Sequence, residues 1–123
     1  MYRHGDVLLR PITQEEFNRR REIRNVLTET VKYRDLKSQK RKKFIVARGE
    51  MTGHHHTLTA EKGGEIEVLR IEGMETLYID VKKGAVLTHQ EHKTLNIPEG
   101  LYEVVRQREY DPGRDREFRP VID

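Results

Sequence analysis

Short apolar segments alternate with polar turns along the chain from Phe44 onward. The segments are rich in β-branched and aromatic residues, and turns containing Gly or Pro separate them roughly every 10 residues. This spacing is typical of an antiparallel β-sandwich or β-barrel. The strands predicted from the pattern are residues 43–48, 56–60, 65–71, 76–81, 85–89, 94–97, 101–110 and 117–122.

The N-terminal third has a different pattern. Residues 6–12 predict a first strand that Pro11 ends. Thr13 and Glu16 form a capping box, which predicts a helix from Gln14 to about Arg24. Residues 25–33 fit either a helical face or a β-strand, and residues 34–43 are expected to form an exposed connection.

These elements predict a single, mainly β domain over residues 1–123. The expected architecture is a small antiparallel β-barrel or a double-sheet sandwich with one N-terminal helix. A basic insertion is expected at about residues 19–43.

Composition narrows the possible chemistry. The chain has no cysteine, which excludes disulfides, thiolate metal ligands and thiol nucleophiles. Only 34% of residues are hydrophobic and 37% are charged, so the core is thin and a homodimer is expected to bury more apolar surface. No signal peptide and no run of about 18 apolar residues is present, so a cytoplasmic protein without a membrane partner is expected.

Charge is distributed unevenly. Residues 19–43 carry eleven Lys or Arg against three acidic residues, a local excess of eight, whereas the rest of the chain carries five net negative charges. This separation favours an anionic partner for the basic segment, with RNA or a nucleotide first, and Lys40, Arg41 and Lys42 are candidate contacts. A solvated hairpin or helix is the alternative interpretation of the same run.

Five of the six histidines fall in two clusters, at residues 54–56 and at His89 and His92. If the first cluster enters a strand, His54 and His56 share one face and His55 lies on the other. Convergence of the two clusters would bring four imidazoles to one end of the sheet. The alternative is that the histidines lie separately at the surface.

A metal site is one interpretation of converged histidines. His54, His56, His89 and His92 would then bind a transition metal such as Zn, Fe, Ni or Cu. The arrangement resembles the cupins, in which an HxH pair on one strand is completed from neighbouring strands. The resemblance is partial, because Thr59 and Ala60 stand where cupins place a carboxylate.

Acid and base catalysis without a metal is another interpretation. At neutral pH one imidazole accepts a proton from a nucleophile such as a ribose 2′-hydroxyl while another donates one to the leaving oxygen. Cations would stabilise the phosphorane, and those near the clusters in sequence are Arg48, Lys93, Arg106 and Arg108. On a strand, Arg106, Arg108 and Tyr110 share one face, which favours phosphate binding or, alternatively, a charged edge strand.

The chain resembles a family of small bacterial and phage proteins with the motifs GE-x-TGH-x-H, H-x-EH and P-x-G-x-Y-x-V-x-x-QREY. The opening "HGDVLLRPI" and the closing "VID" also match, and residues 19–43 do not. The resemblance selects Gly49, Glu50, Thr52, Gly53, His54, His56, His89, Glu91, His92, Pro98, Gly100, Tyr102, Gln107, Arg108, Glu109 and Tyr110. It also implies a kinship with the small ring nucleases that degrade cyclic oligoadenylates in CRISPR-based antiviral defence.

The function predicted first is therefore a metal-independent phosphodiesterase or ribonuclease acting on RNA or a cyclic oligonucleotide. Its predicted catalytic residues are His54, His56, His89, His92, Arg106 and Arg108. Its predicted substrate-binding residues are Arg48, Glu50, Lys93, Tyr102, Gln107, Glu109, Tyr110, Lys40, Arg41 and Lys42. The alternatives are a cupin-like metalloprotein with a four-histidine site and a non-catalytic module that binds nucleic acid or a nucleotide through its basic segment.

Overall fold

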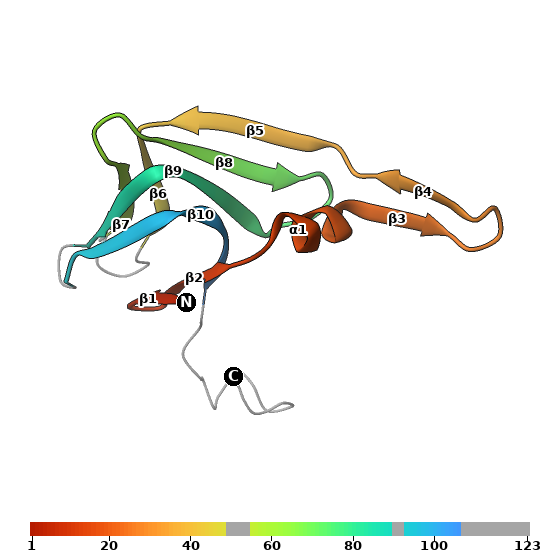
Figure 1. The fold of residues 1–123 in the computed structure, drawn as a ribbon. Helices are drawn as coiled ribbons and strands as arrows, with labels where there is room; N and C mark the ends of the chain where they lie inside the picture. Colours follow the sequence, from red (N-terminus) through yellow and green to blue (C-terminus); the bar gives the residue numbers. More distant parts are fainter. Residues whose placement is uncertain (49–54, 90–92, 107–123) are drawn as a thin grey trace, which may run out of the picture.

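The structure is a computed structural model that describes residues 1–48, 55–89 and 93–106. These residues form antiparallel strands and one short helix, α1 (Gln14–Arg21). The strands curve over one another into a sandwich-like arrangement that does not close into a barrel (Figure 1). The predicted mainly β class with one N-terminal helix is confirmed, and the double-sheet alternative is the one that fits.

The main sheet branches at its longest strands. Strand order runs from β1 (Tyr2–His4) through β2 (Val7–Pro11) and β10 (Leu95–Arg106) to β9 (Leu77–Thr88). The first half of β9 pairs with β8 (Glu65–Ile71), which pairs with β5 (Leu36–Arg41). The second half pairs with β7 (His55–Ala60), which pairs with β6 (Lys43–Arg48). β9 therefore carries two diverging sets of strands.

A bend at Lys83 and Gly84 allows β9 to pair with both β8 and β7. Lys83 has φ 79° and Gly84 has φ 150°, so the chain turns sharply without leaving the strand. The predicted turn between residues 81 and 85 is thus a bend inside one strand, and the two strands predicted there are fused. The strand predicted at 94–97 and the described part of the one predicted at 101–110 are likewise one strand, β10, with an irregular register between Pro98 and Gly100.

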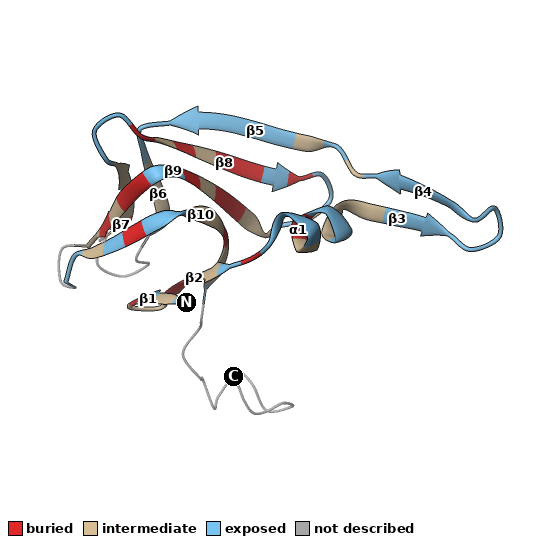
Figure 2. Ribbon diagram, in the orientation of Figure 1, coloured by how far each residue is buried: buried red, intermediate tan, exposed pale blue. Residues whose placement is uncertain are grey.

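Two groups of buried side chains hold the layers together (Figure 2). The larger group gathers the inward residues of β2, β7, β8, β9 and β10, and includes Leu9, Leu58, Val81 and Leu87. In the smaller group Phe17 of α1 packs edge-on against Tyr78, with ring centroids 5.0 Å apart. Burial of these apolar side chains is the main favourable contribution to folding.

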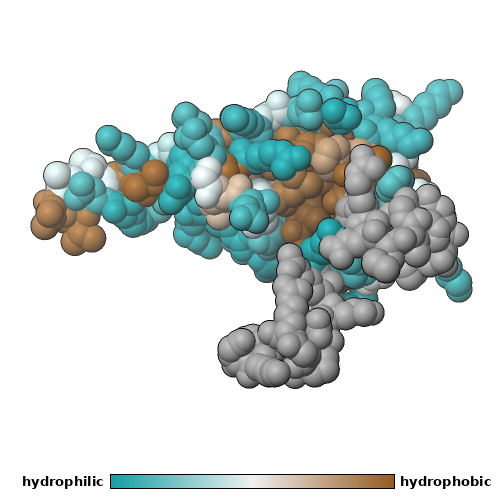
Figure 3. All heavy atoms as spheres, turned by 180° about the vertical axis from the view of Figure 1, so that it is seen from behind, coloured by the Kyte–Doolittle hydropathy of each residue, from teal (hydrophilic) through white to brown (hydrophobic). Residues whose placement is uncertain are grey.

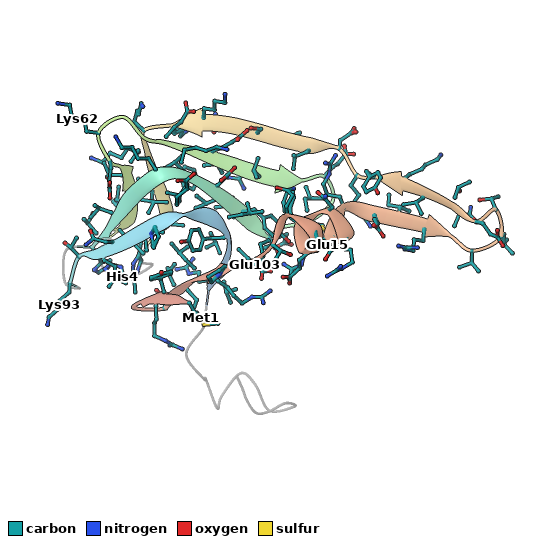
Figure 4. All side chains as sticks on the ribbon, viewed as in Figure 1. Met1, His4, Glu15, Lys62, Lys93 and Glu103 are labelled. Atoms are coloured by element: carbon teal, nitrogen blue, oxygen red, sulfur yellow. The ribbon has the colours of Figure 1, made fainter. Side chains whose placement is uncertain are left out.

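The helix begins where the sequence predicts it. The Thr13 side chain accepts a hydrogen bond from the backbone N–H of Glu16 at 3.0 Å, which caps the helix. The Glu103 carboxylate on β10 ties the helix to the sheet, since it accepts from Arg20 at 2.6 Å and from Arg10 Nε at 2.9 Å. Figure 4 shows Glu103 directed toward the helix.

The helix ends at Arg21, earlier than the predicted Arg24. Residues 22–33 instead form a hairpin of β3 (Glu22–Asn25) and β4 (Thr30–Tyr33), which resolves the helix-or-strand alternative in favour of strands. The prediction that residues 34–43 are a connection is wrong. β5 occupies most of that segment because its backbone pairs with the edge of β8, although its outer residues are exposed.

Two further differences concern the ends of the chain. β1 was not predicted as a strand, and it pairs with β2 through a turn at Gly5 and Asp6. The strand predicted at residues 117–122 lies outside the described residues.

Within the described ranges, no helix is long and apolar enough to span a membrane.

Candidate functional site

Two strands bring buried histidines toward one another. Gly5 has φ 66°, a conformation that permits the tight turn between β1 and β2, and His4 lies immediately before this turn. His56 is the second residue of β7 and points inward, like Leu58, whereas His55 points to the other face. His4 and His56 are only 3% and 4% exposed, so both imidazoles are withdrawn from solvent.

The two buried rings are in direct contact. His4 Nδ1 lies 2.9 Å from His56 Nδ1, and their ring centroids are 5.0 Å apart. His89, which follows the end of β9, lies with its ring centroid 4.3 Å from that of His56 and 6.1 Å from that of His4. The structure therefore brings together His56 and His89 from the two sequence clusters, and adds His4 to them.

The outer nitrogen of each buried ring faces an oxygen. His4 Nε2 lies 2.6 Å from the carbonyl oxygen of Lys93, which precedes β10; Figure 4 labels both residues. His56 Nε2 lies 3.3 Å from Asp6 Oδ1. Arg106 Nε contacts the other carboxylate oxygen of Asp6 at 3.5 Å. A continuous line of polar contacts thus runs from Arg106 through Asp6, His56 and His4 to a backbone carbonyl.

These contacts determine where protons reside. A carbonyl oxygen only accepts, so His4 Nε2 carries a hydrogen and donates it to Lys93. Asp6 Oδ1 lies 3.3 Å from His56 Nε2. The two Nδ1 atoms are joined by one hydrogen across 2.9 Å, and the tautomers of the two rings set which nitrogen donates it.

The separation of the nitrogens fits a hydrogen bond between the rings. An N–H···N hydrogen bond spans about 2.7–3.2 Å, in agreement with the observed contact. Two imidazoles on a tetrahedral metal with metal–nitrogen bonds of about 2.0–2.1 Å hold their nitrogens about 3.3 Å apart. The pair is therefore described as two imidazoles that share one hydrogen, with Asp6 beside His56.

Tyr102 lies apart from the histidines. It is 3% exposed, its hydroxyl donates to the Pro98 carbonyl oxygen at 2.8 Å, and its ring packs against Tyr2. Burial raises the pKa of the Tyr102 phenol above its usual value. These contacts hold the bulged part of β10 in shape, which is a structural role and does not support the predicted role in substrate binding.

The predicted cationic residues divide between two regions. Arg106 lies beside Asp6, and Lys93 approaches His4 through its backbone carbonyl. Lys40 and Arg41 lie on β5, at the far end of the strand order from β1, and Lys42 follows them. Arg48 is opposite His55 in the β6–β7 register. Residues of β5 are thus not brought to the histidine pair by the sheet.

The remaining predicted site residues lie outside the described residues. They are His54, His92, Arg108, Glu50, Gln107, Glu109 and Tyr110. The predicted pairing of His54 with His56 therefore stays a prediction, and His56 pairs with His4. Over the part of the chain that the structure describes, no three His, Asp or Glu side chains are arranged as a metal-binding set.

Sequence reasoning did not select His4 or Asp6. Both belong to the opening "HGDVLLRPI" that carries the family resemblance, and His4 was the one histidine outside the two clusters. That the two residues flank a single glycine was the available signal. Their contact with β7, some fifty residues away in sequence, depends on the strand order.

Fold and site together define a class: a mainly β, sandwich-like protein with a buried histidine pair beside an aspartate. A family model described as a domain of unknown function, DUF8820, matches residues 3–107. The chain belongs to this family. Searches of curated proteins and of solved structures gave no significant match.

Proposed function

We propose that the protein is a metal-independent phosphodiesterase that cleaves RNA or a cyclic oligonucleotide by histidine acid and base catalysis. The observation that carries the proposal is the 2.9 Å contact between His4 Nδ1 and His56 Nδ1, whose outer nitrogens are both directed at oxygen acceptors. In its protonated form such a pair supplies a proton to a leaving oxygen, and imidazole is an effective acid or base near neutral pH.

The neighbouring half-buried His89 supplies the second imidazole. His89 takes the proton of a ribose 2′-hydroxyl while that oxygen forms a bond to phosphorus. The bond from phosphorus to the 5′ oxygen breaks, and the proton shared by His4 and His56 passes to the departing oxygen. The products are a 2′,3′-cyclic phosphate and a 5′-hydroxyl end. Solvent then takes the proton from His89 and returns one to the pair.

Positive charge near the pair supports the same chemistry. Arg106 contacts Asp6 beside the histidine pair, and we assign it to bind the phosphate. His54 and His92 remain sequence-based candidates for further acid, base or substrate contacts. The exposed Lys40, Arg41 and Lys42 are candidate contacts to more distant phosphates of a longer RNA.

The test is cleavage of labelled single-stranded RNA and of cyclic oligoadenylates, with and without chelator. We expect 2′,3′-cyclic phosphate ends, no effect of chelator, and no cleavage of substrates that have 2′-deoxyribose at the cleaved position. His56→Gln and His4→Gln are each expected to reduce kcat about 10²-fold or more, the contribution usual for one acid or base.

His55→Gln is the matched control, because His55 is adjacent in sequence and points to the other face of β7. It is expected to retain most of the activity. Equal loss in the His55 and His56 variants would contradict the assigned roles. Binding of these ligands without any cleavage would instead favour the non-catalytic binding module.

A metal site is the second candidate function, and one specific observation favours it. Metal-bound histidines usually donate their other ring N–H to a carboxylate or a carbonyl; here His4 donates to the Lys93 carbonyl and His56 Nε2 lies 3.3 Å from Asp6. Elemental analysis of protein purified without an affinity tag separates the two candidates. Stoichiometric metal that is lost in His56→Gln and retained in His55→Gln would replace the metal-free proposal.

A further inference from the structure

Three segments that are far apart in the sequence meet at the end of β7 away from the histidine pair. Ala60, the last residue of β7, donates its backbone N–H to the carbonyl oxygen of Lys42 at 2.7 Å. The next residue, Glu61, donates to the carbonyl oxygen of Gly84 at 3.0 Å. The connection between β5 and β6, the turn between β7 and β8 and the bend of β9 are therefore adjacent.

Each of these segments brings basic side chains to the same place. Lys42 Nζ donates to the carbonyl oxygen of Gly64 at 2.5 Å. Lys83 Nζ lies 3.0 Å from the position that a Cβ atom would take at Gly63, so this glycine leaves room for the ammonium group. The basic side chains of the three segments, called the basic corner below, are all exposed; they are Arg41, Lys42, Lys43, Lys62 and Lys83.

The acids of the neighbouring strands lie on the other face of the sheet. Arg41 is opposite Ile66 in the β5–β8 register, and alternation along β8 places both acids of that strand on the face away from Ile66. Asp80 of β9 is opposite one of these acids and shares their face. The turn between β7 and β8 contributes one further acid, Glu61, so five basic side chains share the corner with one carboxylate.

Lys83 supplies its charge from an unfavourable backbone conformation. Its φ is 79°, a value that residues other than glycine rarely adopt. Strained residues concentrate at functional sites, where the surrounding structure holds them in place. A lysine at this bend therefore supports a binding role for the corner.

A polyanion fits the corner better than an apolar partner. Within the described part of the chain, none of the exposed large hydrophobic side chains lies in the three segments. Most of them lie on the β3–β4 hairpin, and Figure 3 shows its hydrophobic tip at the end of the projection. Basic side chains from several strands neutralise successive phosphates of a nucleic acid without contacting its bases.

The corner lies at a defined separation from the histidine pair. Ala60 is four residues beyond His56 on β7, which corresponds to about 13 Å at about 3.3 Å per residue. Figure 4 shows Lys62, in the corner, well apart from His4. A stacked strand advances about 3.4 Å per nucleotide, so the separation corresponds to about four nucleotides. A nucleotide ring folds back on itself and needs about twice as many to span it.

We propose that the basic corner binds the phosphate backbone of a linear RNA substrate, about four nucleotides from the bond that is cut at the histidine pair. The proposal rests on the proposed phosphodiesterase for the position of the cut, and it selects linear RNA over a small cyclic oligonucleotide. Binding at the corner is measurable without cleavage.

The first experiment measures binding of a fluorescent single-stranded RNA of about 12 nucleotides, whose 2′-O-methyl groups prevent cleavage. The variant Lys43→Gln, Lys62→Gln, Lys83→Gln removes one charge from each segment. We expect its Kd to rise about 10-fold or more, and the slope of log Kd against log salt to fall by about 2, since each contact to a single strand contributes about 0.7. The corresponding triple arginine variant keeps the charges and is expected to keep the affinity.

The matched control removes the same charge elsewhere. Lys32→Gln, Lys37→Gln, Arg70→Gln changes exposed residues on the hairpin and at the far end of β5 and β8. Its Kd is expected to change by about 3-fold or less. Circular dichroism checks that each variant remains folded.

The second experiment compares cleavage of a long and a short substrate. A dinucleotide occupies the histidine pair without reaching the corner, whereas an RNA of about 12 nucleotides reaches both. In the glutamine variant of the corner, the ratio of kcat/KM for the long RNA to kcat/KM for the dinucleotide is expected to fall about 10-fold, through KM of the long RNA.

Three outcomes would overturn the proposal. They are a corner variant that binds RNA with the wild-type Kd and salt slope, an equal loss in the control variant, and an unchanged ratio of kcat/KM. Loss of binding to phosphatidylserine vesicles with unchanged RNA affinity would assign the corner to lipid head groups instead. Binding of RNA by the wild type without any cleavage would contradict the proposed function, and the Kd values would still decide whether the corner binds RNA.

Discussion

The facing Nδ1 atoms of His4 and His56 illustrate how much single contacts determine at the residue scale. Each ring has one nitrogen near an oxygen, and the two inner nitrogens share one hydrogen. Asp6 lies beside His56, and Arg106 contacts the other oxygen of that carboxylate. Nitrogen NMR of the imidazoles is expected to show one hydrogen between the two Nδ1 atoms, and His56→Gln is expected to remove that signal.

Tyr102 gives a prediction of stability at this scale. Burial raises the pKa of its phenol above the usual 10.0, and its hydroxyl donates to Pro98. The unfolded chain therefore ionises first, so the stability linked to this group is full below about pH 10 and is lost as pH rises beyond that value. Tyr102→Phe is expected to cost about 1 kcal/mol near neutral pH and to flatten the alkaline loss.

Urea unfolding between pH 7 and 11 measures the effect of the Tyr102 substitution. Tyr33→Phe, at a tyrosine that is 54% exposed, is the control and is expected to retain the alkaline loss because Tyr102 is intact. An unchanged alkaline slope in Tyr102→Phe would contradict the prediction.

At the scale of the element, the bend in β9 decides the shape of the sheet. Lys83 adopts φ 79°, a positive value that residues other than glycine rarely adopt. On either side of it, the two halves of β9 pair with different strands. The sequence pattern correctly predicted a change of chain direction at Lys83 and Gly84. It did not distinguish a turn between two strands from a bend within one strand, because glycine is typical of both.

Substitutions at Lys83 test the backbone strain. We expect Lys83→Val to be less stable than Lys83→Gly by about 1–2 kcal/mol, since a β-branched residue fits a positive φ poorly and glycine adopts it freely. Chemical denaturation measures the difference. Lys82→Val on the same strand is the control, with a cost of about 1 kcal/mol or less from the lost ion pair to Asp80. Equal stability of the two Lys83 variants would show that the bend is not strained.

At the scale of the whole molecule, a thin core in the main sheet supports the β3–β4 hairpin (residues 22–33), which lies outside it. Leu87 is fully buried in the core, whereas Leu27 is 94% exposed at the tip of the hairpin. The same residue type therefore stabilises the fold at one position and lies exposed at the other.

The same substitution at both leucines separates these contributions. Leu87→Ala is expected to lower the free energy of unfolding by about 2–5 kcal/mol because it leaves a cavity. Leu27→Ala is expected to change it by about 0.5 kcal/mol or less. Denaturant titration of both variants provides the measurement, and a large loss at Leu27 would place the hairpin inside the cooperative fold.

The sequence by itself determined the features that depend on neighbours along the chain. The alternating apolar positions predicted most strands, Thr13 predicted the start of the helix, and period-two alternation predicted that His55 and His56 face opposite ways. These signals are local because capping and strand alternation act within a few residues.

Only the tertiary structure decided which distant residues meet. The pairing of β5 with β8, the fusion of β9 and β10 from shorter segments, and the contact of His4 and Asp6 with His56 all depend on strand order. Antiparallel pairing joins backbones whose hydrogen-bonding groups are the same in every residue, so side-chain patterns leave the choice of partner open. The choice is made by the core as a whole, when the inward faces of all the strands are buried together.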